Sequence, residues 1–183
     1  MSHADDSLYY PDYLQLEQLL GCQALESTRR GAPAHDEMLF IIVHQAYELW
    51  FKQILWELDA LIELFQREAV DERRLGRAVS HLYRILTIQR VLVDQIDVLQ
   101  TMTPLDFLDF RDQLVPASGF QSVQFRLIEN RFGLRRADRL LIHDANYLAR
   151  FAPKDRARLQ ASEETPSLFE GVERLVVPEG LRL

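Results

Sequence analysis

Apolar residues recur every three or four positions along much of the chain, which is the period of a helix that buries one side. The clearest stretch runs from Asp36 to about Arg67 and contains neither glycine nor proline. It predicts one helix of roughly 30 residues, about 45 Å long. Its predicted inner side consists of Leu39, Ile42, Ala46, Leu49, Gln53, Trp56, Ala60 and Leu64. No segment alternates apolar and polar residues for more than a few positions, so we predict no strand.

A second long helix is predicted from about Asp71 to Gln100. Because the polar link from Glu68 to Glu72 is short, the two long helices should pack antiparallel. The inner side predicted for the second helix consists of Leu75, Val79, Leu82, Leu86, Val91, Ile96 and Leu99.

Capping signals then predict shorter helices. Thr103-Pro104 is typical of a helix start, with Asp106 at the third position, and this helix should end near Leu114. After a break at Pro116–Gly119, another helix is predicted over Phe120–Phe132, with Gly133 as its C-terminal stop.

The pattern weakens after residue 134, where the chain is rich in arginine, until Thr165-Pro166 indicates one more helix start. No repeat or linker divides the sequence. We therefore expect a single all-α domain over residues 1–183, a helical bundle built on two long antiparallel helices.

Composition and charge narrow the function classes. Of 183 residues, 48% are hydrophobic and 27% charged, which is typical of a globular chain. The net charge is −7, from 21 basic and 28 acidic residues without a basic stripe, so we expect neither nucleic acid nor an anionic membrane as a partner. The polar, acidic start is unlike a signal peptide, and the longest apolar run, Met38–Val43, is too short for a membrane span. With the single cysteine Cys22, this predicts a soluble, cytoplasmic protein.

Familiar catalytic signatures are missing from the sequence. The five histidines never lie four positions apart, and none follows a glutamate by three, which excludes HExxH and di-iron helix motifs. There is no GxGxxG, P-loop or GxSxG. A cofactor would therefore be held in a pocket between helices.

The richest stretch is HDEMLFIIVHQAYELWFKQILWEL, residues 35–58. Helical geometry places His44 among aromatic residues with carboxylates a turn or two away, on a side that comprises Glu37, Phe40, Ile41, His44, Tyr47, Glu48 and Phe51. A buried histidine satisfied by a neighbouring hydrogen bond is one interpretation. The other is functional: Glu37 and Glu48 would be costly there unless paired, and the aromatic width suits a flat ligand.

A second stretch, residues 101–133, also carries candidate chemistry. Phe107 and Arg111 lie four positions apart, so a ring and a guanidinium share one helix face and could hold a carboxylate. Alternatively, Arg111 is solvated beside its acidic neighbours. Ser118-Gly119 offers donors near a helix start. Arg126 and Glu129 are interpreted as an ordinary helix ion pair, and Tyr9, Tyr10 and Tyr13 as a hydrophobic staple.

These motifs, together with YPDYLQLEQLL at residues 10–20, resemble the tryptophan 2,3-dioxygenase family over residues 9–133, and residues 134–183 are interpreted as a divergent tail. The segments that carry the resemblance are HDEMLFIIVHQAYELWFKQILWEL, TMTPLDFLDFRDQL and PASGFQSVQFRLIEN, in the family's order. The resemblance implies an all-α heme enzyme, commonly a homotetramer, that opens the indole ring of L-tryptophan with O2 to give N-formylkynurenine.

The resemblance also implies roles for individual residues. His44 would be the catalytic distal histidine, which accepts a hydrogen bond from the indole N–H. Arg111 would bind the substrate carboxylate, beside Phe107, which lacks the hydroxyl that a tyrosine would offer there. The substrate pocket would be lined by Phe40, Ile41, Ile42, Val43 and His44. Tyr10 and Tyr13 would reach the active site of a neighbouring subunit. Ser118 and Gly119 would form a loop at the distal side of the heme.

The sequence departs from the family after the second stretch. Family members carry a proximal heme histidine and a Gly/Thr-rich loop in later helices, and this chain, which ends at Leu183, is expected to contain neither. Neither His81 nor His143 is expected to replace the axial ligand, so no metal ligand is predicted in the chain. The alternative to a dioxygenase is therefore a shortened, non-catalytic helical remnant or an oligomerisation module.

Overall fold

The protein is described by a computed structural model that covers residues 7–66, 72–134, 139 and 147–176. Every regular element in this part of the chain is a helix, as predicted. The helices are α1 (Tyr10–Leu14), α2 (Leu16–Leu20), α3 (Glu26–Arg29), α4 (Glu37–Gln66), α5 (Glu72–Gln100), α6 (Pro104–Leu114), the 3₁₀ turn η1 (Gly119–Gln121), α7 (Val123–Phe132), the 3₁₀ turn η3 (Tyr147–Arg150), α8 (Pro153–Glu163) and α9 (Leu168–Val176).

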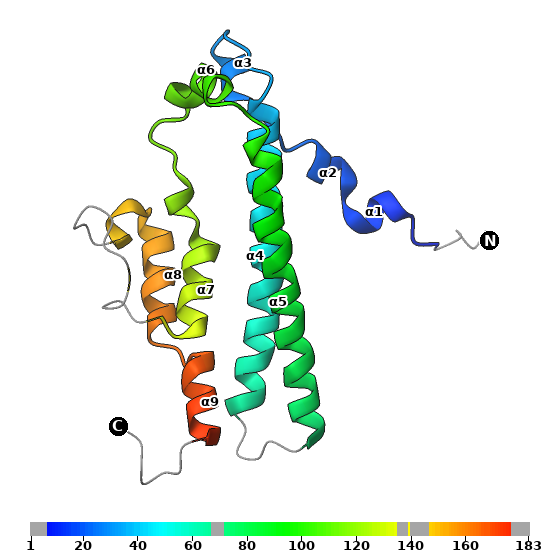
Figure 1. Cartoon of the computed structure of the whole chain (residues 1–183), viewed down its shortest axis with the longest axis vertical. Coiled ribbons are helices and arrows are strands. Elements are labelled where there is room, and N and C mark those ends of the chain that lie inside the picture. Colours follow the sequence, from blue (N-terminus) through cyan, green and yellow to red (C-terminus); the bar gives the residue numbers. More distant parts are fainter. Residues whose placement is uncertain (1–6, 67–71, 135–138, 140–146, 177–183) are drawn as a thin grey trace, which may run out of the picture.

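The two long helices α4 and α5 lie side by side and antiparallel, which confirms the predicted hairpin (Figure 1). Their observed bounds agree with the predicted ones to within one residue at each described end. The predicted link between them lies outside the described residues. Helices α7 and α9 pack on the other side of α4, α8 packs on α7, and α3 and α6 lie together at one end of the hairpin (Figure 1). Helices α1 and α2 extend away from it.

The predicted inner sides of the two long helices are only partly right: Leu64 and Leu82 pack against the core, but other members are exposed. Three members of the stripe on α4, Ile42, Leu49 and Trp56, are exposed, and 75% of Trp56 is accessible. On α5, Leu75 and Val79 are exposed as well. The core lies elsewhere because α4 is covered by α5, α7 and α9 together. It comprises Ile54, Leu58, Leu61, Ile62 and Phe65 of α4, Ala78, Ile85 and Ile88 of α5, Ile128 of α7 and Leu168 of α9.

Helix α6 begins as the sequence predicts. Its N-cap is Thr103, whose hydroxyl accepts from the Asp106 amide at 3.3 Å, while the Asp106 carboxylate accepts from the Thr103 amide at 3.0 Å. These two bonds form a capping box. Hydrogen bonds from the Thr103 side chain and backbone also lower the pKa of Asp106.

Helix α7 begins three residues later than predicted. Ser118 caps the single turn η1, and Ser122 then caps α7 by accepting from the Phe125 amide at 3.1 Å. A second serine therefore restarts the helix after Phe120. The predicted stop at Gly133 is confirmed, with φ of +99°. A Cβ there would lie 2.8 Å from that of Phe169, so the position needs glycine for its space as well as its backbone.

Helix α9 does not begin at Thr165-Pro166 as predicted. Ser167 provides the capping box: its hydroxyl accepts from the Glu170 amide at 3.2 Å, and its own amide donates to the Glu170 carboxylate at 2.7 Å. Thr165 instead accepts from Arg131 of α7 at 2.6 Å. Among the described helices, none has the length and hydropathy to cross a membrane.

Candidate functional site

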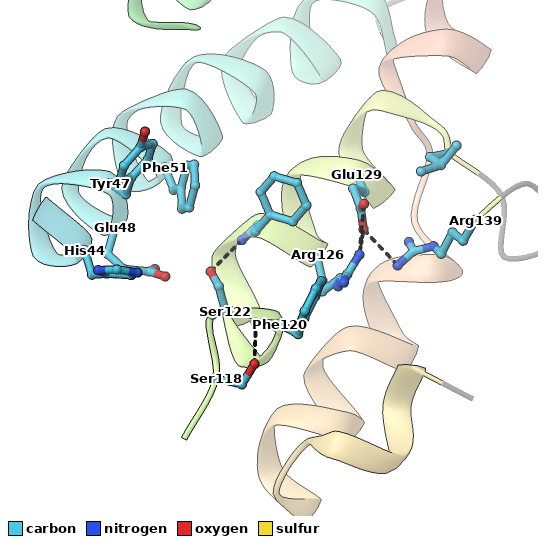
Figure 2. A pocket seen from close by; sticks show the side chains of 13 residues that line it. His44, Tyr47, Glu48, Phe51, Ser118, Phe120, Ser122, Arg126, Glu129 and Arg139 are labelled. Carbon is cyan, nitrogen blue, oxygen red and sulfur yellow. Dashed lines mark hydrogen bonds and ion pairs between the residues drawn. The ribbon is translucent and has the colours of Figure 1, made fainter. Parts of the chain in front are cut away.

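A cavity of about 670 Å³ lies between α4 and α7, within the size range of small-molecule sites (Figure 2). Three segments and two single residues line it. They are His44, Tyr47, Glu48 and Phe51 of α4, residues Ser118, Gly119, Phe120 and Ser122 around η1, Phe125, Arg126 and Glu129 of α7, and Leu134 and Arg139 beyond α7.

His44 stands at one end of this cavity, and its protonation pattern is fixed by the backbone. Its Nδ1 lies 2.7 Å from the carbonyl oxygen of Phe40 one turn earlier. A carbonyl can only accept, so Nδ1 must carry the proton. In the neutral ring, Nε2 then has a free lone pair and acts as an acceptor. His44 is therefore suited to receive a hydrogen bond from a ligand N–H.

An aromatic cluster joins this end of α4 to α6. The Phe40 ring centroid lies 4.1 Å from that of His44, 5.7 Å from that of Phe107 and 5.6 Å from that of Phe110. Phe110 is fully buried and anchors the cluster. Arg111 follows it on α6 and is exposed. The structure thus brings Phe40, His44 and Phe107 together, with Arg111 on the adjoining helix.

In the middle of the cavity, hydrogen-bonded polar groups lie beside aromatic rings, and the Glu48 carboxylate keeps its charge because its partner is an uncharged amide. The Tyr47 hydroxyl donates to the Leu92 carbonyl of α5 at 2.6 Å, and burial raises the pKa of this phenol. Gln124 of α7 donates to both the backbone carbonyl of Glu48, at 2.7 Å, and its carboxylate, at 2.8 Å. The ring of Phe51 packs 5.6 Å from that of Phe125, centroid to centroid.

The opposite end of the cavity is cationic. Arg126 donates from Nη1 to both carboxylate oxygens of Glu129, at 3.0 and 2.8 Å, which confirms the predicted ion pair. Arg139 donates to the same carboxylate at 3.1 Å (Figure 2). Two permanently charged guanidinium groups share one carboxylate, so this group of three side chains carries a net positive charge.

The predicted site residues fall into three groups. His44, Ser118 and Gly119 line the cavity. Phe40, Phe107 and Arg111 lie in or beside the aromatic cluster at its end. The remaining ones lie elsewhere: Ile41 is half-buried outside the lining, Ile42 lines a separate groove near Pro33, Val43 is buried, and Tyr10 and Tyr13 are exposed on α1.

Glu37 has a structural explanation. Its carboxylate is 1% exposed and accepts from the amides of Glu26 and Ser27, at 2.8 and 2.9 Å, at the start of α3. It therefore caps a neighbouring helix and does not face the cavity.

Sequence reasoning missed several lining residues, above all Phe120, Phe125 and Arg139. Phe125 lies three positions after the Ser122 cap and packs against Phe51 of α4, a contact between helices that the local sequence pattern does not reveal. Nothing in the local pattern around Arg139 indicates its position, since its neighbours in space come from α7 and η3.

Within the described residues, no group of three histidine, cysteine or acidic side chains could hold a metal ion. His44 is the histidine that borders the cavity. His81 pairs with Glu57 inside the hairpin, at 2.5 Å, and His143 lies outside the described residues.

Comparison with known proteins identifies the family. The family model described as tryptophan 2,3-dioxygenase matches residues 1–180, so the similarity extends past the segment that carries the sequence motifs. A tryptophan 2,3-dioxygenase of Alteromonas mediterranea is 53% identical over 166 residues, which are 91% of this chain and 46% of that protein. Those of Dictyostelium discoideum and Rattus norvegicus are 51% and 50% identical over 91% of this chain, and 42% and 41% of their own lengths. The chain thus spans less than half the length of these relatives, and it belongs to the tryptophan 2,3-dioxygenase family.

Proposed function

We propose that the cavity and the adjoining aromatic cluster form the substrate side of a heme-dependent dioxygenase site, which opens the indole ring of L-tryptophan with O2 to give N-formylkynurenine. The observation that carries this proposal is the contact of 2.7 Å between Nδ1 of His44 and the carbonyl oxygen of Phe40. With Nδ1 donating to the Phe40 carbonyl, Nε2 can accept a hydrogen bond from the indole N–H. The rings of Phe40 and Phe107 offer apolar faces against which the indole would pack.

Arg111 is proposed to bind the carboxylate of the substrate. It follows Phe107 by one helical turn, so the two side chains share a face of α6. A guanidinium can bind a carboxylate through two parallel hydrogen bonds, which would fix the orientation of the amino acid as well as its affinity. Ile41, Ile42 and Val43 are proposed to shape this end of the pocket through the packing of α4.

We propose that heme occupies the cavity, which is lined by aromatic rings and two arginines. Phe51 and Phe125 would hold the flat apolar ring beside Ser118 and Gly119, and the cationic end would face the ring's carboxylates. When bound, the heme iron would supply the activation of O2. The relatives are more than twice as long as the matched segment, so this proposal concerns the part of the site that lies in the matched segment.

Assembly and location follow from the same proposal. Tyr10 and Tyr13 are exposed on α1, which extends away from the hairpin, and we propose that they reach a neighbouring subunit of a homo-oligomer (Figure 1). The family resemblance suggests a tetramer. The free cysteine Cys22 and the acidic charge are consistent with the cytoplasm.

Reconstitution tests the proposal. The purified chain is titrated with hemin, alone and with the C-terminal part of a close relative, and is assayed for a Soret band and for N-formylkynurenine. We expect His44→Ala to lower product formation about tenfold, since one hydrogen bond contributes up to about 1.5 kcal/mol and about 1.4 kcal/mol corresponds to a factor of ten in rate. His35→Ala is the matched control because His35 lines a separate groove. Equal effects of the two substitutions would reject the role of His44.

The role of Arg111 is tested by binding. Arg111→Ala should lower the affinity for L-tryptophan at least tenfold, since a charge-assisted hydrogen bond contributes about 1.5–3 kcal/mol. The same substitution should leave the affinity for tryptamine, which lacks the carboxylate, nearly unchanged. Unchanged L-tryptophan affinity would reject the assignment.

A second candidate, an oligomerisation module without catalysis, is favoured by the exposed stripe on α4. Ile42, Leu49 and Trp56 are apolar, spaced by seven positions and left uncovered by the described residues. Under this alternative, the chain self-associates but gives no Soret band on reconstitution. Sedimentation of the wild type and of Trp56→Lys measures the association, and a Soret band with product formation decides for the enzyme.

A further inference from the structure

Arg139 is buried at the wall of the cavity although it carries a full charge. Its side chain is 6% exposed, and a guanidinium does not lose its proton in proteins. Burying such a charge is unfavourable unless it is paired and hydrogen-bonded. The partners of Arg139 therefore show which arrangement its burial maintains.

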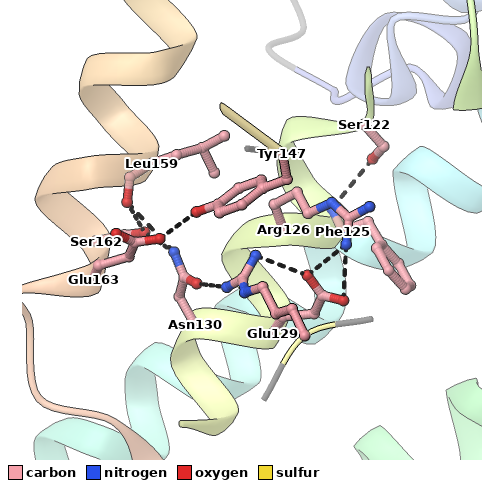
Figure 3. Close-up of polar contacts among 10 residues, drawn as sticks. Ser122, Phe125, Arg126, Glu129, Asn130, Tyr147, Leu159, Ser162 and Glu163 are labelled. Carbon is pink, nitrogen blue, oxygen red and sulfur yellow. Dashed lines mark hydrogen bonds and ion pairs between the residues drawn. The ribbon is translucent and has the colours of Figure 1, made fainter. Parts of the chain in front are cut away.

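Three neighbours hold Arg139 in place. Its Nη1 donates to Glu129 at 3.1 Å, its Nη2 donates to the side-chain oxygen of Asn130, and its guanidinium carbon lies 4.3 Å from the centroid of the Tyr147 ring. Asn130 is in turn fixed by α8, where it donates to the Ser162 hydroxyl (Figure 3). The buried Nε has no partner among the described residues. Arg139 is thus rigidly oriented toward Glu129 even though one of its donors is unsatisfied.

Arg139 also affects the charge balance around Arg126. Both arginines line the cavity, and Glu129 is the carboxylate that they share. If Glu129 paired with Arg126 alone, the two charges would cancel. Because Arg139 binds the same carboxylate, one positive charge remains at this end of the cavity, while the Glu48 carboxylate lies near His44 at the other end (Figure 2). Within the described residues, Arg126 uses only Nη1, so its Nη2 and Nε remain available to a ligand.

We propose that Arg139 is a positioning residue that keeps this end of the cavity cationic, so that the cavity prefers flat apolar ligands that carry a carboxylate or sulfonate over uncharged ones. This rests on the proposed function in one respect, namely that the cavity accepts a flat aromatic ligand. A merely structural role, in which Arg139 only ties α7 to the segment before α8, would affect charged and uncharged ligands equally.

Two dyes of matched shape test the proposal on the full chain. Anilinonaphthalene sulfonate carries an anionic group, and N-phenyl-1-naphthylamine is its uncharged analogue. Their affinities are measured by fluorescence titration for the wild type and for Arg139→Gln. We expect the wild type to bind the sulfonate dye more tightly than the uncharged dye. R139Q should lower the affinity for the sulfonate dye about tenfold and change the affinity for the uncharged dye by less than about twofold.

Two further variants give the expected sign and the control. Glu129→Gln removes the shared negative charge, so it should raise the affinity for the sulfonate dye about threefold. The affinity for the uncharged dye should stay the same. Arg131→Gln is the matched control: Arg131 is also on α7 and binds Asp59 and Thr165, but it does not line the cavity. This variant should change the affinity for neither dye. Should R139Q fail to fold, E129Q still decides, because its expected effect has the opposite sign.

The proposal is overturned if the wild type binds neither dye. It is also overturned if R139Q changes the affinities for both dyes equally or changes neither, or if E129Q lowers the affinity for the sulfonate dye. Titration with hemin separates it from the proposed function. If hemin does not bind but the dye preference depends on Arg139 as stated, the cationic end is supported and heme is rejected as the ligand. If hemin binds and R139Q leaves the dye preference unchanged, the role of Arg139 is rejected and the proposed function stands.

Discussion

Two glutamates of this chain are each held by several nitrogen-bearing partners: Glu57 on α4 by three and Glu129 on α7 by two. Glu57 accepts from Arg84 at 2.8 Å and lies 2.5 Å from Nδ1 of His81 across the helix hairpin. Glu129 accepts from Arg126 and Arg139 beside the cavity. The contacts are chemically alike, but their surroundings differ. Glu57 is 2% exposed, and Glu129 is 18% exposed.

The balance of charge differs as well. At Glu57, one permanent cation, Arg84, meets one carboxylate, and the amide of Gln53 is uncharged. At Glu129, two permanent cations meet one carboxylate, and one positive charge remains next to an open cavity. A balanced, buried group joins two helices, whereas an unbalanced group at a cavity wall is available to a ligand. We infer that Glu57 serves the fold and that Glu129 serves the site.

The largest expected effect comes from removing the buried carboxylate. Glu57→Ala should lower the free energy of unfolding by about 3 kcal/mol, since breaking a buried pair by deleting one partner costs about 3–5 kcal/mol, and both partners here can partly regain water. Urea unfolding followed by circular dichroism measures this. Asp59→Ala is the control on the same helix, where an exposed pair with Arg131 contributes under about 1 kcal/mol. Equal losses in the two variants would refute a special role for Glu57.

Acid should expose the same difference. Burial opposes the ionisation of Glu57, but hydrogen bonds from His81, Arg84 and Gln53 outweigh it and hold its pKa below the ordinary 4.5. A carboxyl with a lowered pKa stabilises the fold above its unfolded-state pKa, and this contribution is lost as the pH falls through the folded-state value. The advantage of wild type over Glu57→Gln should therefore be constant at neutral pH and shrink below about pH 4.5. Urea titrations at several pH values measure it, and an advantage that grows in acid contradicts the assignment.

Glu129→Gln should separate stability from binding. The amide still accepts hydrogen bonds, but the buried Arg139 loses its counter-charge, so we expect a loss of about 2 kcal/mol in unfolding free energy. The same variant should bind the sulfonate dye more tightly, because the cavity wall gains net positive charge. Measured on one sample, the two quantities should move in opposite directions. If both fall together, Glu129 resembles Glu57 and the contrast between the two groups is lost.

Local signals in the sequence predicted much of the fold because their causes are local. Thr103 and Asp106 cap α6 through bonds that span three positions, and Gly133 ends α7 through its own backbone angle. The length of α4 follows from the absence of glycine and proline, and α5 contains no proline and a single glycine, Gly76, near its start. The candidate site was predicted where the residues lie in a single helix, as His44 and its carbonyl partner Phe40 do.

The buried sides of the helices could not be predicted in the same way. The apolar stripe through Leu49 and Trp56 has the right period, yet packing by α7 and α9 buries Leu58 and Phe65 instead. Periodicity shows that a helix is amphipathic, but it does not show which other helices pack against it. Arg139 was missed for a related reason, since its role depends on Glu129, ten positions earlier, and on Tyr147.

The smallest expected effect concerns the outer partner of Glu57. The Arg84 side chain is 56% exposed, so water competes for its guanidinium and salt screens its charge. Arg84→Gln should cost less than about 1 kcal/mol of unfolding free energy, and the difference from wild type should vanish near 1 M salt. Arg139→Gln, with a buried guanidinium, should cost more and depend little on salt. Urea titrations at low and high salt compare the two variants. If their salt dependence were the same, burial would not be what distinguishes the cation of the fold from the cation of the cavity.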